Sequence, residues 1–320
     1  MVGGGSNLDE LFKTYLQNHS LKGLSSISKS DLHNHLGRGG NKNYIETTVN
    51  VKIDLPPTTF DSLSHMDEWF KDNIKKYCPY IKRLEAAFVQ AANDNISVLA
   101  ANFGFGDDNT MGGMELEAFI HMMKRFNQQF APNTILLPEL SFGRACDTDK
   151  ELSRLDEILS YNWFKSVDIN AGESEQPIKN FKKIYRKAKE YGLRLKAHVG
   201  EFGKADDVME AVEELELDEV HHGIAAAKSE AVMKWLSKNK IQLNICPTSN
   251  VMLRVVESYF VHPIRKLYDN GIPVTINTDD MLIFNQSVSQ EYLNLFISGL
   301  MNADELNIIR ETGLKEIKMR

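Results

Sequence analysis

Cysteine is scarce in this sequence, and its three copies, Cys78, Cys146 and Cys246, lie far apart. None belongs to a CxxC pair, which argues against a disulfide framework or a thiolate zinc site and predicts reduced thiols in a cytoplasmic protein. Apolar runs of membrane-spanning length are missing too, so no membrane partner is expected. The opening MVGGGSNLDE lacks the basic start and apolar core of a signal peptide, and residues 1–6 are expected to be disordered.

Basic residues are not in excess, because 37 Lys and Arg stand against 44 Asp and Glu for a net charge of −7. This balance argues against a polymeric nucleic acid as partner and is compatible with a small substrate. No GxGxxG motif opens a first strand–helix unit and no Walker loop is present, which disfavours nucleotide-cofactor folds. The 320 residues are 42% hydrophobic and show no evident linker, so we predict one domain over residues 1–320.

Apolar, β-rich runs alternate with segments of helical periodicity along most of the chain. We predict eight strands, at residues 30–36, 96–103, 134–142, 164–170, 193–199, 219–222, 241–246 and 272–278. Helices are expected at 7–19, 66–77, 80–93, 115–130, 148–160, 178–191, 205–215, 229–238, 262–269, 289–300 and 303–311. Eight strands that alternate with helices predict an α/β fold, a (β/α)₈ TIM barrel with extra helices at the N- and C-terminal ends, rather than an open doubly wound sheet.

Two histidines one residue apart, His33 and His35, end the first predicted strand. Side chains two apart on a strand share a face, so both imidazoles would aim at one point, as two ligands of one metal ion require. On its own the pair is equally compatible with a polar loop. Barrel enzymes place their chemistry at the C-terminal ends of strands. Further metal-type and acid–base side chains follow strands five, six and eight: His198, Glu201, His221, His222, Asp279 and Asp280.

Each of these residues also has an ordinary structural interpretation. His198 alone would suit a hydrogen-bonded core histidine, and the two aspartates could cap the next helix. His221 is expected to point away from its neighbour His222, into the packing between barrel and helices. Cys246 is interpreted as a small buried residue. The remaining histidines, on helices or loops, are taken as surface or packing residues: His19, His65, His121 and His262. What favours a site is that the other members gather at one rim.

Five blocks follow one another from the first predicted strand to the last: DLHNHLG, KAHVGEFG, VHHGIAA, NICPTSN and TINTDDMLIF. The series resembles the adenosine deaminase family of the metal-dependent amidohydrolase superfamily, and the HxGE block narrows the match to the deaminase branch. The resemblance implies hydrolytic deamination of a 6-aminopurine nucleoside, adenosine or deoxyadenosine, to inosine or deoxyinosine and ammonia. The H-x-E and P-C-x-x-C signature of the cytidine-deaminase type is absent.

The resemblance also implies one divalent ion, with zinc expected and iron, cobalt or manganese left open. Such an ion lowers the pKa of water from about 15.7 to about 7. Its ligands would be His33, His35, His198 and Asp279.

Roles for other residues follow from the same resemblance. Glu201 would protonate the purine ring nitrogen beside the attacked carbon, while His222 would orient the water and take its proton. Asp279 would join these two as a catalytic residue. Asp280 would hydrogen-bond the imidazole-ring nitrogen of the purine. The backbone of Gly172 would contact the opposite edge of the base, and His35 and Arg38 would also border the substrate.

Three places depart from the family: the loop after the first strand, the stretch ANFGFGDD, which lacks the usual acid–arginine pattern, and Met281, which replaces a common proline after the paired acids. Gly37 stands where the family usually has an acid that binds the ribose 5′-hydroxyl, and a glycine-rich loop with Arg38 and Lys42 follows. Such a loop suits phosphate binding, so a purine 5′-nucleotide such as AMP or dAMP is one alternative substrate, although a tight turn with solvated cations explains the loop equally well. Free adenine is another alternative, and a non-catalytic binding barrel is a third. The oligomeric state is left open.

Overall fold

The structure is a computed structural model that describes residues 5–104 and 114–318. Residues 1–4 of the segment expected to be disordered lie outside this range, as does most of the loop expected after the second strand (Gly104–Asp108). Residues 5 and 6 instead begin the first helix. Within the described ranges, none of the helices is both long and apolar enough to cross a membrane.

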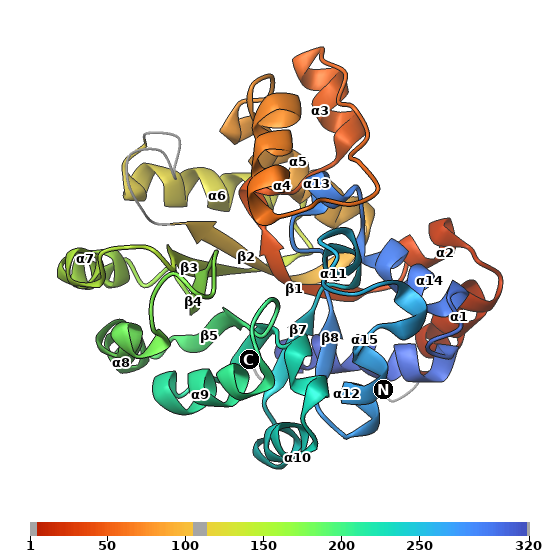
Figure 1. Cartoon of the computed structure of the whole chain (residues 1–320). Helices are drawn as coiled ribbons and strands as arrows, with labels where there is room; N and C mark the ends of the chain where they lie inside the picture. The colour runs from red at the N-terminus through yellow and green to blue at the C-terminus, as the bar shows by residue number, and fades with distance from the viewer. Residues whose placement is uncertain (1–4, 105–113, 319–320) are drawn as a thin grey trace.

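Eight parallel strands form one sheet in the order β1 to β8, each paired with the next along the chain (Figure 1). The two edges meet where Asn34 bridges Asp279, and the backbone N–H of His35 donates to the carbonyl of Asp279 at 3.1 Å. The sheet is therefore a nearly closed barrel, which confirms the predicted fold class. The strands are β1 Lys29–His35, β2 Ile96–Gly104, β3 Ile135–Gly143, β4 Ser166–Asn170, β5 Arg194–Val199, β6 Glu219–His222, β7 Gln242–Ile245 and β8 Val274–Ile276.

Helices surround the strands, as Figure 1 shows. The α-helices are α1 Gly5–Gln17, α2 Leu21–Ser25, α3 Lys42–Val49, α4 Leu63–Phe70, α5 Tyr80–Asn93, α6 Leu116–Phe130, α7 Thr148–Ser160, α8 Lys182–Glu190, α9 Ala205–Leu215, α10 Glu230–Asn239, α11 Pro247–Met252, α12 Ile264–Asp269, α13 Met281–Phe284, α14 Val288–Ile297 and α15 Ala303–Lys318. Four short 3₁₀ segments, η1 Leu36–Arg38, η3 Ile178–Phe181, η4 Ile224–Lys228 and η5 Tyr259–Val261, and one π segment, η2 Lys71–Lys75, complete the described chain.

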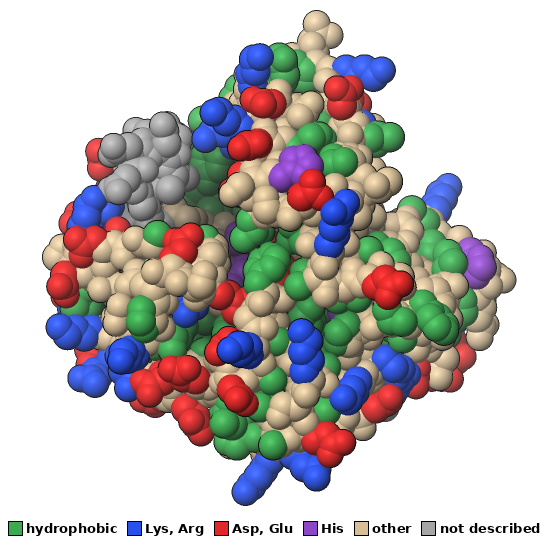
Figure 2. Space-filling view, viewed as in Figure 1, with side chains coloured by type: hydrophobic (Ala, Val, Ile, Leu, Met, Phe, Trp, Pro, Cys, Tyr) green, Lys and Arg blue, Asp and Glu red, His purple; other side chains and the backbone are tan. Residues whose placement is uncertain are grey.

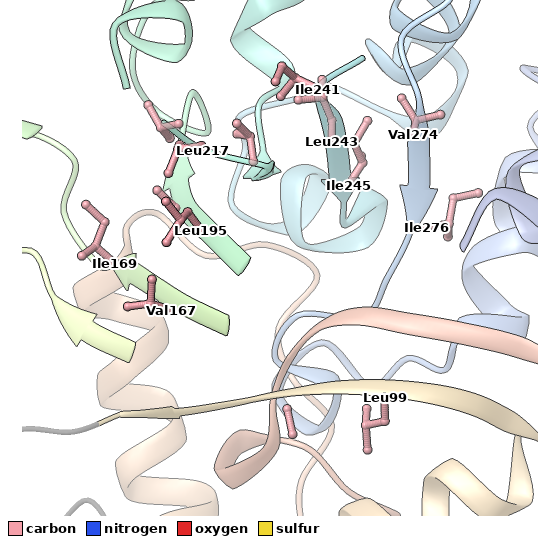
Figure 3. Close-up of a cluster of buried hydrophobic side chains, with 14 of the residues drawn as sticks. Leu99, Val167, Ile169, Leu195, Leu217, Ile241, Leu243, Ile245, Val274 and Ile276 are labelled. Carbon is pink, nitrogen blue, oxygen red and sulfur yellow. The ribbon is translucent and has the colours of Figure 1, made fainter. Parts of the chain in front are cut away.

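Side chains alternate between the two faces of the barrel wall, as the two-residue period of a strand requires. On β5, Leu195 packs in the main hydrophobic cluster together with residues of the outer helices, and Figure 3 shows Leu195, Leu243 and Ile276 in this layer. Inward positions are instead often polar. Buried Lys196 lies 3.0 Å from Glu139 Oε2 in the interior. The barrel thus has an apolar outer wall and, at these positions, a charged interior that opens toward the site.

A separate hydrophobic cluster lies under helices α3 and α4, near the C-terminal rim of the barrel. It joins Ile45, Phe60 and Phe70 to Leu253 and Phe284 from the other end of the chain. Helix α3 was not expected from the sequence; it begins after Asn41, whose side chain accepts a hydrogen bond from Tyr44 N. This layer forms part of the wall of the cavity that holds the candidate site.

Candidate active site

A cavity of about 580 Å³ opens at the C-terminal ends of the strands. Figure 2 shows the surface hollowed beneath the α3–α5 layer, with histidine colour visible inside the hollow. The cavity brings together residues from both ends of the sequence, as a barrel rim does. Seven residues of the predicted site line it: His35, Arg38, His198, Glu201, His222, Asp279 and Asp280.

Four side chains form a compact group at the cavity floor, which we call the His/Asp cluster: His33, His35, His198 and Asp279. One ligand atom from each lies within 4.8 Å of all the others. His198 Nε2 is 3.0 Å from His33 Nε2 and 3.3 Å from His35 Nε2. Asp279 Oδ1 is 3.5 Å from His33 Nε2 and 3.3 Å from His35 Nε2.

Hydrogen bonds on the far side of two rings decide what these nitrogens offer. His198 Nδ1 lies 2.9 Å from Asp168 Oδ1, and His33 Nδ1 lies 3.3 Å from the carbonyl oxygen of Asn244. Both partners only accept, so each ring carries its proton on Nδ1 and presents a lone pair at Nε2. Two lone pairs that face each other at 3.0 Å repel unless a cation lies beside them. The donor set therefore fits a divalent metal ion such as zinc.

Ionisation in the cluster agrees with this chemistry. Burial, reinforced by the other histidines, holds the pKa of His33 well below its ordinary value, so the ring is neutral as a ligand must be. Burial opposes a charge on His35, but its hydrogen bond with Asp279 and the nearby Asp280 raise the pKa of His35 to about 9. A proton on His35 and a metal ion would compete for the same lone pair, so metal binding displaces that proton.

Backbone conformation aims Asp279 at the cluster. It has a positive φ of 59°, an uncommon value for a residue other than glycine, directly after the last strand. The hydroxyl of Ser249 donates to Asp279 Oδ2 at 2.7 Å, and Oδ1 faces the two histidines of β1. Burial disfavours its charge, yet the hydrogen bond with His35 and the surrounding histidines keep the pKa of Asp279 below its usual range. Asp279 is therefore an anion whose carboxylate faces the two histidines of β1.

The pKa of Glu201 is shifted in the opposite direction from that of Asp279. Burial, and then the charges of Asp279 and Glu173, raise its pKa well above the ordinary value, which favours the protonated form of the carboxyl. Its Oε1 atom is buried without a hydrogen-bond partner among the described residues. The loop that carries it is anchored by Glu173, whose Oε1 accepts from Glu201 N at 2.9 Å and whose Oε2 accepts from Gly200 N at 2.8 Å. The loop is therefore held so that Glu201 lines the cavity.

His221 and His222 do not alternate as expected. The prediction that His221 packs between barrel and helices is wrong, because its ring lies 4.1 Å from that of His33 and its Nε2 is 2.9 Å from Glu139 Oε1. His221 shares the inward face with Glu219, two residues earlier on β6, and His222 breaks the strand period because its positive φ of 64° turns this ring inward as well. His222 Nε2 lies 3.5 Å from Glu201 Oε2.

Asp280 and Arg38 face each other across the cavity wall. Arg38 Nη1 donates to Asp280 Oδ2 at 3.3 Å and lies 2.7 Å from Asp67 Oδ1. Burial raises the pKa of Asp280 even though Arg38 opposes the shift. Its Oδ1 atom is buried and has no hydrogen-bond partner among residues 5–104 and 114–318. Asp280 therefore offers a second free oxygen to a ligand.

The loop that departs from the family is only partly in the site. Lys42 pairs with Glu46 at 3.8 Å and is not among the residues that line the cavity. A side chain at Gly37 would meet the Tyr80 ring at 2.4 Å, so Tyr80 fills the space that an acid at position 37 would need. Arg83 and Lys75 line this part of the wall beside Arg38. Gly172 lies between two lining residues, Ala171 and Glu173, without lining the cavity itself.

Several supporting residues were missed in the sequence. Asp168 orients His198, Glu173 anchors the Glu201 loop and Ser249 holds Asp279. The sequence contained a signal for Asp168, because the alternation of side chains along β4, Ser166–Asn170, places this residue inside the barrel. It contained none for Glu173 and Ser249, since Glu173 lies in the loop after β4 and Ser249 in the short helix α11, and the closed barrel brings both to partners that are distant in sequence.

Three imidazoles and a carboxylate meet at one point on the rim of this (β/α)₈ barrel. That combination of fold and site defines a metal-dependent hydrolase. Comparison with known proteins narrows this class. The adenosine deaminase family profile matches residues 133–315. A putative adenosine/adenine deaminase from Treponema pallidum is 30% identical over 298 residues, 91% of this chain and 99% of that protein. An adenine deaminase from Rhodospirillum rubrum is 34% identical over 205 residues, 62% of this chain and 60% of that protein.

Solved structures share the fold. An adenine deaminase from Arthrobacter aurescens superposes with a TM-score of 0.72 at 21% identity, covering 91% of this chain and 99% of that one. Arabidopsis ADAL complexed with IMP gives 0.76 at 17% identity, covering 92% and 95%. An amidohydrolase from Burkholderia ambifaria with bound Zn gives 0.66 at 20% identity, covering 92% of each chain. The chain belongs to the adenosine deaminase family, as its motifs predict, and is a metal-dependent hydrolytic deaminase.

Proposed function

We propose that the protein deaminates a 6-aminopurine nucleoside, adenosine or deoxyadenosine, to the 6-oxopurine and ammonia. The observation that carries the proposal is a pair of buried carboxyl oxygens without partners, Glu201 Oε1 and Asp280 Oδ1, in residues that line a cavity beside the His/Asp cluster. Buried polar atoms that the fold leaves unpaired are costly and mark places for a ligand. Two such atoms match a planar heterocycle with ring nitrogens on both of its edges.

The His/Asp cluster is proposed to hold one zinc ion through Nε2 of His33, His35 and His198 and through Asp279. When bound, such an ion supplies a nucleophile at neutral pH by lowering the pKa of water from about 15.7 to about 7. Asp168 fixes the ligand ring of His198 through its hydrogen bond to Nδ1 at 2.9 Å. The Zn-bound amidohydrolase that shares this fold supports zinc as the metal.

The chain's own groups then supply the rest of the chemistry. Glu201 donates its proton to the ring nitrogen beside the carbon that carries the amino group, so that this carbon accepts the oxygen nucleophile. The raised pKa of Glu201 supports this role, because it favours a carboxyl that still holds its proton. Asp280 binds the imidazole-ring edge of the purine, and His222 orients the nucleophile from beside Glu201. The exocyclic amine leaves as ammonia once it takes the proton of the hydroxyl group added to the same carbon, and the proton first lost by the water, which passes to solvent, balances the one that returns Glu201 to its acid form.

The size of the cavity bears on whether the substrate carries a sugar. At about 580 Å³ it has the size of sites that enclose whole small molecules, and a free base would leave much of it to solvent. This supports a nucleoside over adenine. A 5′-nucleotide is the second candidate, because the cations Arg38, Lys75 and Arg83 all line the cavity. The neighbour complexed with IMP supports the same candidate.

The test is an ultraviolet assay on zinc-loaded protein with adenosine, deoxyadenosine, AMP, dAMP and adenine. We expect turnover of a nucleoside to rank first and to vanish in Glu201→Gln. Faster turnover of AMP or dAMP, reduced selectively in Arg38→Ala, would replace the nucleoside proposal with the nucleotide one. Adenine ranked first would reject both. No turnover by metal-loaded protein across the panel would reject the proposed function and favour a different amine or a binding role.

A further inference from the structure

A chain of buried polar side chains reaches His222 from outside the cavity lining. It runs from His262, at the C-terminal cap of η5, to Asn250 in α11 and on to His222. His262 is 1% exposed and Asn250 is fully buried, and neither lines the cavity. The sequence interpretation treated His262 as a packing residue, and no role that we have derived for the site uses it.

The direction of the first two hydrogen bonds is fixed by a backbone amide. Ile264 N donates to His262 Nδ1 at 3.1 Å, so Nδ1 carries no proton. Burial lowers the pKa of His262 to about 3, which leaves a neutral ring with its one proton on Nε2. That Nε2–H group donates to Asn250 Oδ1 at 3.2 Å.

The hydrogen bond from His262 also fixes the orientation of the Asn250 amide, and so decides which of its atoms faces His222. With its oxygen toward His262, its Nδ2 group faces His222 Nδ1 at 3.3 Å and donates to it. The flipped amide would set two donors against each other at His262, so only one orientation satisfies both contacts. His222 Nδ1 is therefore an acceptor, and the proton of the neutral ring lies on Nε2. This nitrogen is 3.5 Å from Glu201 Oε2 and 3.7 Å from Asp279 Oδ2.

We propose that His262 and Asn250 are positioning residues that hold the neutral His222 ring with its proton on Nε2, facing the reacting groups. His222 then meets the oxygen nucleophile as an N–H donor, a role that rests on the proposed function. Because Nε2 carries the proton and offers no lone pair, His222 orients the nucleophile and stabilises its charge, and the proton lost by the water passes to solvent rather than to His222 as the family resemblance implies.

Three substitutions separate this role from simple packing. Asn250→Asp keeps the shape of the side chain but turns its donor into an acceptor, so His222 Nδ1 must gain a proton. His262→Leu removes the donor that orients the amide, and His262→Gln restores a donor at the position of Nε2. His121→Gln, at an exposed histidine of α6, is the matched control for the loss of a histidine.

The experiment is ¹⁵N NMR of histidine-labelled, zinc-loaded full chain, with the His222 signals assigned by their loss in His222→Gln. We expect an unprotonated Nδ1 and a protonated Nε2 in the wild type and in His262→Gln, and a protonated Nδ1 in Asn250→Asp. A wild-type ring with its proton on Nδ1 overturns the proposal, and this result needs no variant to fold. An Nδ1 that stays unprotonated in Asn250→Asp, at a pH where the ¹³C shift of the new carboxyl shows it ionised, overturns it as well.

Kinetics supply the second readout, taken at a pH where the spectrum shows one ring proton. Placing the proton on the wrong nitrogen should lower kcat of Asn250→Asp about 10²- to 10⁴-fold with KM little changed. His262→Leu should lower kcat and His262→Gln should recover most of it. Equal kcat in all three variants and the control overturns the positioning role. The spectrum tests the tautomer even if no purine is turned over, so failure of the proposed function is distinguishable.

Discussion

Glu173→Gln tests whether the loop that carries Glu201 is held by one carboxylate. Three backbone N–H groups point at Glu173, with Glu201 N at 2.9 Å and Phe202 N at 2.8 Å from Oε1 and Gly200 N at 2.8 Å from Oε2. A glutamine amide keeps one accepting oxygen for the first two and turns its NH₂ group toward the third. One hydrogen bond to a charged group is lost, which is worth about 1.5–3 kcal/mol.

If all of this energy holds Glu201 in place, kcat/KM should fall roughly 10- to 150-fold. A second effect concerns pH. Glu201 acts while protonated, so activity is lost as the pH rises through its pKa. Burial raises that pKa most, and the charges of Asp279 and Glu173 add to the rise. Removing the Glu173 charge should therefore move the high-pH limb of the kcat/KM profile to lower pH.

The assay is kcat/KM against pH on the best purine of the panel, with a thermal melt to confirm folding. Glu175→Gln, two residues away and exposed, is the matched control. A Glu173→Gln enzyme with the control's kcat/KM and an unmoved high-pH limb would refute the anchoring role.

Three further outcomes are expected. Removing metal with a chelator should abolish activity and lower the melting temperature, because an ion present at a thousand times its Kd adds about 4 kcal/mol of stability; an unchanged melt would count against the His/Asp cluster as a metal site. Gly37→Asp should cost about 1–3 kcal/mol in urea unfolding, because its Cβ meets the Tyr80 ring at 2.4 Å, and adding Tyr80→Ala should recover part of that loss; equal stability of the single variant and wild type would refute the clash. Lys196→Met removes the buried cation 3.0 Å from Glu139 and 3.4 Å from Glu219, leaves two buried carboxylates with fewer partners, and should cost about 3–5 kcal/mol in urea unfolding. A cost no larger than that of Lys234→Met, at an exposed position, would show that this interior charge network is dispensable.

Periodicity predicted the barrel because the strands repeat a regular unit. The sixth strand was predicted at residues 219–222, and β6 is Glu219–His222. Helices α3 and α11 were missed for a physical reason. Each is short, and each owes its position to partners that are distant in sequence, such as the cluster that packs Ile45 of α3 together with Met252 of α11. No window of local sequence contains that information.

The same distinction between local pattern and tertiary contacts applies to the site residues. Position in a strand sufficed to bring His33, His198 and Asp279 to one rim, because the C-terminal ends of parallel strands meet there. The orientation of His221 did not follow, since the strand period fails where His222 adopts a positive φ of 64°. The partners that orient the site, such as Asn250, depend on which loops the closed barrel brings together. Residue types predicted the chemistry, and tertiary contacts determine how each group is held.

The most direct test of the account compares wild type and Glu201→Gln at equal zinc content. Conversion of a 6-aminopurine to the 6-oxopurine is followed by ultraviolet absorbance, and released ammonia is measured in the same samples. Under the proposed function we expect one ammonia for each purine converted by the wild type and a loss of turnover of about 10²- to 10⁴-fold in the variant, because a general acid has been removed. Equal turnover by both proteins, or none by zinc-loaded wild type on any 6-aminopurine, would contradict it.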